Sequence, residues 1–81
     1  MNTGKEFQLS DGRKVVIKEA KGHHAEKAMR IAGSGQPEKY LTALMASTVT
    51  IDGKPIVPED LSDMRLKDYN AIQAEFADIN F

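Results

Sequence analysis

The 81-residue sequence contains no cysteine and no tryptophan, and only 6% of its residues are aromatic. Without cysteine the chain can form neither a disulfide nor a thiolate metal site, which favours a reducing compartment, the cytoplasm. No apolar run approaches the roughly 18 residues that a membrane-spanning helix needs, and the first residues lack the apolar core of a signal peptide. The net charge is -1 with both signs mixed along the chain, so we expect neither a nucleic-acid nor a membrane partner.

The length predicts a single domain, residues 1–81, with a small core, because a chain this short buries only about 60% of its unfolded surface. The patterns predict an α+β fold. An N-terminal β-hairpin packs with about three short α-helices, and a second short hairpin or turn lies near residues 51–56. We expect residues 78–81 to form a frayed tail.

Two loop lengths are compatible with the first hairpin. A two-residue loop at Asp11 and Gly12 would pair Phe7 with Val16, whereas a three-residue loop that includes Ser10 pairs Phe7 with position 15. The longer loop is favoured because it places the alternating apolar residues on one face of the hairpin and leaves Gly12 free to take a positive φ. These apolar residues are Phe7, Leu9, Val15 and Ile17.

Apolar residues at three- and four-residue steps predict helices over about residues 23–32, from 37 to 46 or 48, and over about 66–77. Glycines at positions 33 and 35 suit a helix end, and Pro37 suits the first turn of the second helix. A single helical turn is expected at residues 58–61, and Asp63 is a plausible cap for the last helix.

Polar residues of the kinds that build active sites have plainer interpretations here. His23 and His24 are adjacent on a helix, so their side chains point about 100° apart and rarely share a metal ion. The stretch at 33–35 lacks the spacing and the lysine of a phosphate-binding loop. Asp52 suits a turn, and the acidic pair at 59–60 suits a helix start. Four serines also lack a nucleophile motif: Ser10, Ser34, Ser47 and Ser62. We expect no enzyme, no catalytic residue, no metal site and no cofactor.

The apolar helix stripes suggest a binding surface instead. Three stripes share one short hairpin as their sheet partner, so part of the apolar surface is expected to remain uncovered and to bind another protein or a second copy. Methionines on such stripes more often simply fill the core, although they also suit adaptable binding surfaces. The candidate partner-binding residues are Met29, Tyr40, Met45, Tyr69, Ile72 and Phe76.

The order of these pieces supports a more specific hypothesis. LSDGRKVVI at residues 9–17 is followed by Lys21-Gly22, KAMRIAG at 27–33, a second helix, TIDGKPI at 50–56, EDL at 59–61 and a final helix. From about Phe7 to Phe76, the chain resembles the tail assembly chaperones of Mu-like and P2-like contractile-tailed phages and prophages. The shared motifs are turn and helix patterns, not catalytic ones.

The resemblance implies a non-catalytic protein that binds the tape measure protein, a long helical chain, and keeps it soluble during tail assembly. It implies residence in the host bacterial cytoplasm, absence from the mature virion and a possible longer form made by frameshifting. A second copy of the chain, in a homo-oligomer, is a further candidate partner. Another small protein-binding module, such as an antitoxin-like regulator or adaptor, is the main alternative. A hydrolase accessory or metal-binding domain is another.

Overall fold

The first hairpin has the predicted register. The structure is a computed structural model that describes residues 4–33 and 35–81. Strand β1 (Lys5–Gln8) pairs antiparallel with β2 (Lys14–Ile17), and Phe7 lies opposite Val15. Val15 is fully buried and Val16 is partly exposed. The prediction that the apolar alternation sets the register is therefore confirmed.

The loop of this hairpin has the predicted three residues, 10–12. The Leu9 N–H donates to the Arg13 carbonyl at 2.9 Å, and the Gly12 N–H donates back to the Leu9 carbonyl at 3.0 Å. Gly12 has a φ of 90°, a conformation that residues with a Cβ rarely adopt. The glycine thus permits the tight reversal that puts Phe7 and Val15 side by side.

The two predicted hairpins join into one four-stranded antiparallel sheet with the order β1-β2-β3-β4. Strand β3 (Val49–Ile51) pairs with both β2 and the short β4 (Lys54–Pro55). The second turn has positive φ values at Asp52 and Gly53, as a tight two-residue hairpin turn requires. The sequence predicted the turn but not the pairing of β2 with β3.

Helices α1 (Gly22–Ala32) and α2 (Pro37–Thr48) confirm the first two helical patterns. The N–H of Gly33 donates to the Met29 carbonyl and closes α1, as expected for a helix-ending glycine. Of the stretch 33–35, the structure describes only the two glycines, since Ser34 lies outside the described residues. Helix α2 continues through Thr48, the later of the two predicted ends.

The chain ends in two helices, α3 (Pro58–Ser62) and α4 (Leu66–Asn80). Residue Arg65, not Asp63, precedes the first turn of α4, so the predicted cap is wrong. Helix α4 runs three residues beyond 77, into the stretch that was expected from the sequence to fray. The Asn80 side-chain oxygen accepts the Ala20 N–H at 2.7 Å, which ties the end of α4 to the chain after β2.

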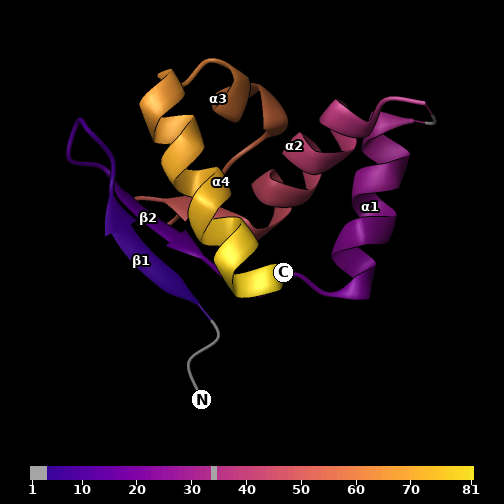
Figure 1. Cartoon of the computed structure of the whole chain (residues 1–81), viewed down its shortest axis with the longest axis horizontal. Coiled ribbons are helices and arrows are strands. Elements are labelled where there is room, and N and C mark those ends of the chain that lie inside the picture. Colours follow the sequence, from indigo (N-terminus) through magenta and orange to yellow (C-terminus); the bar gives the residue numbers. More distant parts are fainter. Residues whose placement is uncertain (1–3, 34) are drawn as a thin grey trace.

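The helices share one core with the inner face of the sheet. Helix α4 packs against β2, α2 packs against α1 and α3, and α1 lies at the far end of the molecule from the hairpin (Figure 1). None of the described helices has both the length and the apolar character that a membrane crossing requires. The largest fully buried side chains come from the sheet and from three helices: Val15, Ile17, Met45, Thr48, Val49, Leu61, Ile72 and Phe76.

Candidate protein-binding surface

Half of the predicted binding residues lie in the core. Met45 on α2 has 0% exposure, and Ile72 and Phe76 on α4 are equally inaccessible. The prediction was that some of the six residues form an uncovered surface, and these three do not contribute to one in the folded chain, because the sheet and the neighbouring helices cover them. In the core, these three side chains stabilise the folded state.

The other three predicted residues remain accessible to different degrees. Met29 on α1 is 56% exposed, whereas Tyr40 and Tyr69 are partly buried and pack against the core. Tyr69 lines a shallow hollow together with Met64 and Leu66. The helical pattern therefore identified one exposed apolar residue, Met29, and two residues at the margin of the core.

Other exposed apolar residues define a groove that the sequence did not predict. The groove lies where the end of α1 meets the first turns of α2 and α3, and it encloses about 440 Å³. Ile31 and Val57 are 55% and 54% exposed and contribute apolar side chains from two separate walls. We call this surface the α1–α3 groove; its lining residues are Ile31, Ala32, Glu38, Lys39, Thr42, Val57, Pro58, Glu59 and Ser62.

Only weak sequence signals pointed to this groove. Ile31 lies beside the buried alanine stripe of α1, on the flank opposite Met29, and Val57 directly precedes the proline that begins α3. Neither position belongs to a helical apolar stripe. The two become neighbours through the packing of α1 and α3 on α2, which local periodicity does not encode.

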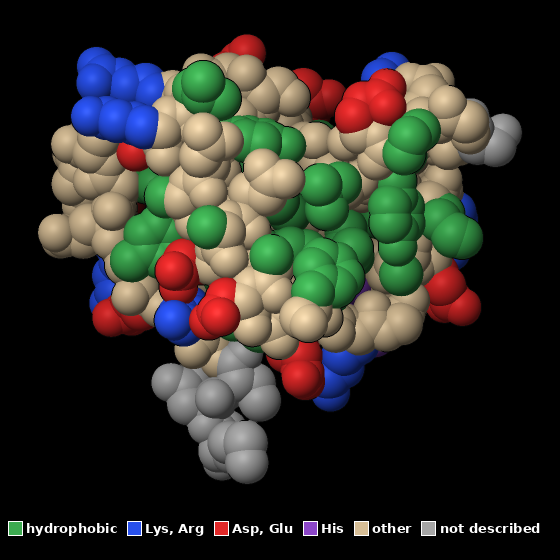
Figure 2. All heavy atoms as spheres, in the orientation of Figure 1, with side chains coloured by type: hydrophobic (Ala, Val, Ile, Leu, Met, Phe, Trp, Pro, Cys, Tyr) green, Lys and Arg blue, Asp and Glu red, His purple; other side chains and the backbone are tan. Residues whose placement is uncertain are grey.

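The apolar surface continues beyond the groove. Thr42 and Ser62 line both the α1–α3 groove and the hollow that holds Tyr69 and Leu66, so the two depressions adjoin. Figure 2 shows hydrophobic side chains gathered along α1 and in the middle of the face between α1 and α4, with charged side chains mostly around the edge. An apolar centre with a charged margin is typical of protein-binding surfaces.

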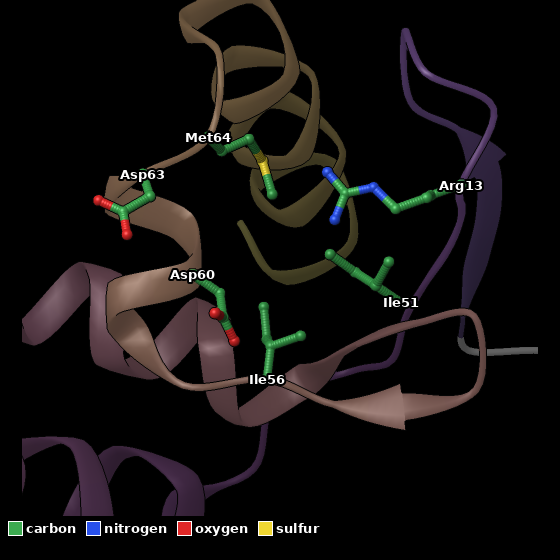
Figure 3. Close-up of a pocket in the computed structure, with 6 residues that line it drawn as sticks. All are labelled: Arg13, Ile51, Ile56, Asp60, Asp63 and Met64. Atoms are coloured by element: carbon green, nitrogen blue, oxygen red, sulfur yellow. The ribbon is translucent and has the colours of Figure 1, made fainter.

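A third hollow, near the first hairpin, contains charged residues that do not converge on a ligand. Arg13 and Met64 point toward each other across it, while the Asp63 carboxylate points away (Figure 3). The Asp60 carboxylate accepts the Val57 N–H at 3.1 Å, and the Arg13 Nε donates to Asp11 at 2.7 Å. The Asp60 and Arg13 side chains therefore stabilise a helix start and a turn, respectively.

The two histidines lie side by side at the start of α1, where His24 caps the helix. Their ring centroids are 4.1 Å apart, and the His24 Nδ1 accepts the Lys21 N–H at 2.9 Å. Partial burial, followed by the charges of His23 and nearby lysines, lowers the pKa of His24 below its ordinary value. Among residues 4–33 and 35–81, no group of three or more potential metal-ligating side chains comes together.

One polar contact far apart in sequence was not predicted. The Asp68 carboxylate accepts the Ser10 N–H at 2.9 Å and the Ser10 hydroxyl at 2.8 Å, across 58 positions of the chain. These two hydrogen bonds lower the pKa of Asp68 and fasten the first hairpin loop to the start of α4.

Comparison with protein-family models, curated proteins and solved structures finds no match to this chain.

Proposed function

We propose that this chain is a non-catalytic tail assembly chaperone of a contractile-tailed phage or prophage. Its client is the tape measure protein, which the chaperone keeps soluble in the host cytoplasm until the tail tube forms around this client. The observation that carries the proposal is the open α1–α3 groove, where Ile31 and Val57 stand half exposed on a folded surface. Apolar grooves of this kind accept the apolar face of an amphipathic helix.

The order of sequence motifs narrows this general role to the tail assembly chaperones. The α+β fold, with its two glycine turns, keeps those motifs in the places that the sequence predicted. A long helical client offers many similar sites, so that several weakly bound copies cover it together. The polar clusters described above stabilise turns and helix ends, which favours binding over catalysis.

Co-expression with the tape measure protein from the same genome tests the proposal. We expect the tape measure protein to sediment when it is expressed alone and to stay in the supernatant, bound to this chain, when both are present. A soluble, folded chain that leaves its client in the pellet would contradict the proposal. Stable co-purification with a neighbouring toxin instead would support the regulatory alternative.

A further inference from the structure

The rim of the α1–α3 groove carries more acidic than basic charge. Glu38 on α2 and Glu59 on α3 stand on two different walls, and Lys39 is the single basic residue of the lining. No described lysine or arginine nitrogen forms an ion pair with either carboxylate; the ion pairs of the described chain lie at the hairpin and at α4. Both acidic side chains thus remain available to a partner with positive charges.

The described part of the chain offers no helix of its own that fits this groove. An inserted helix needs exposed apolar residues three or four positions apart on one face. The exposed apolar residues of α1, Met29 and Ile31, lie about 200° apart and do not share a face. On α4, Leu66 is followed three positions later by Tyr69, but Tyr69 is partly buried and packs against the core. A second copy therefore offers this groove no helix with a fully exposed apolar stripe.

From these two observations we infer that the α1–α3 groove binds client helices whose apolar stripe is flanked by lysine or arginine. Ile31 and Val57 receive the stripe, while Glu38 and Glu59 select the basic flank. This inference rests on the proposed function and adds the position of the binding site and the chemistry of the bound segment. Electrostatic selection of this kind is salt dependent, because exposed charges are screened.

Two matched variants of α1 test the position of the site. Ile31→Lys places a charge in the groove, and Met29→Lys makes a similar change on the opposite flank of the same helix at equal exposure. Lysine is a good helix former, so both variants should stay folded, which circular dichroism checks. We expect Ile31→Lys to weaken binding of the tape measure protein at least about tenfold, and Met29→Lys to leave it unchanged.

Charge variants test the chemistry of the bound segment. Glu38→Lys combined with Glu59→Lys should weaken binding, whereas Lys39→Glu should strengthen it, and both effects should shrink at high salt. Glu19→Lys with Glu26→Lys supplies the control, because it changes the net charge equally at exposed positions outside the groove. Equal loss in both double variants would mean that overall charge, not the groove, attracts the client.

Photo-crosslinking identifies the occupant directly. A photoreactive amino acid at position 31 should crosslink to tape measure segments rich in flanking lysine and arginine, and the same group at position 29 should not. A crosslink from position 31 to a second copy of this chain would overturn the inferred occupant. If the unmodified chain keeps its client soluble and Ile31→Lys does so equally well, the groove assignment fails while the proposed function stands. If the unmodified chain does not solubilise the client, both fail.

Discussion

Alanine substitution at two methionines should distinguish a core position from a surface position by its effect on stability. Met45 lies on α2 with 0% exposure, whereas Met29 lies on α1 with 56% exposure. Methionine and alanine both favour helices, so the change in helix propensity is small and nearly equal at the two positions. The difference in unfolding free energy between Met45→Ala and Met29→Ala therefore measures burial.

The expected magnitudes differ severalfold. Met45→Ala removes buried side-chain volume and leaves a cavity, at a cost of about 2–5 kcal/mol. A chain of 81 residues has a total stability of roughly 4–12 kcal/mol at about 0.05–0.15 kcal/mol per residue. A loss of about 3 kcal/mol would lower the melting temperature by roughly 10–25 °C in a domain of this size. Met29→Ala should change stability by no more than about 0.5 kcal/mol.

Urea unfolding followed by circular dichroism measures both variants. We expect the midpoint of Met45→Ala to fall with little change in the slope m, and the midpoint of Met29→Ala to stay near that of the unmodified chain. Equal midpoints for the two variants would refute the burial that the structure gives to Met45. It would also restore Met45 as a candidate for the binding surface.

Three further predictions concern a turn and two titrating groups. Gly12→Val should lower stability by about 1 kcal/mol or more, seen as a lower melting midpoint, because a β-branched residue resists the φ of 90° at this position. The pKa of His24 is lowered from 6.5 in the folded chain, so the unfolded chain takes up the proton first and stability should fall as the pH drops below about 6.5. This dependence should disappear from pH-dependent melting curves of His24→Gln and persist in His23→Gln. The pKa of Asp68 is likewise lowered from 3.8, so the stabilising contribution of its carboxylate is present above that value and is lost as acid protonates it in the folded state. Asp68→Asn should therefore flatten the fall in stability at acidic pH. An unchanged fall would show that the hydrogen bonds from Ser10 do not hold the carboxylate ionised.

The first hairpin was predictable because its constraints are local. Strand side chains alternate between faces, so the positions of Phe7 and Val15 determine which loop length brings the apolar residues together. Gly12 supplies the positive φ that this loop requires. The same local reasoning located the Asp52–Gly53 turn and the start of α2 at Pro37, and it left two possible ends for α2, of which Thr48 is the observed one.

The remaining contacts depend on how distant segments meet. The pairing of Val16 with Thr50 joins the two hairpins across 34 positions, since 50 minus 16 is 34. The hydrogen bonds from Ser10 to Asp68 span 58 positions. Asp68 reads in the sequence as an ordinary acidic residue in the first turn of a helix, where it would complement the helix dipole. No residue next to Asp68 in the sequence indicates that its carboxylate accepts two hydrogen bonds from Ser10 in the first hairpin loop.

The position of the candidate binding surface also depends on how distant segments pack. The sequence-based argument assumed that three helix stripes share a single hairpin, but the sheet has four strands and the helices also cover one another. Stripe positions such as Met45 and Ile72 are consequently enclosed, and accessible apolar area remains at helix flanks and connections, at Ile31 and Val57. Substitutions at the enclosed stripe positions, such as Met45 and Ile72, should therefore mainly change stability. Substitutions at Ile31 or Val57 can change client binding while the fold persists. Because Ile31 and Met29 occupy opposite flanks of one helix at equal exposure, a difference between their variants would assign binding to one side of α1 rather than to exposed apolar area in general.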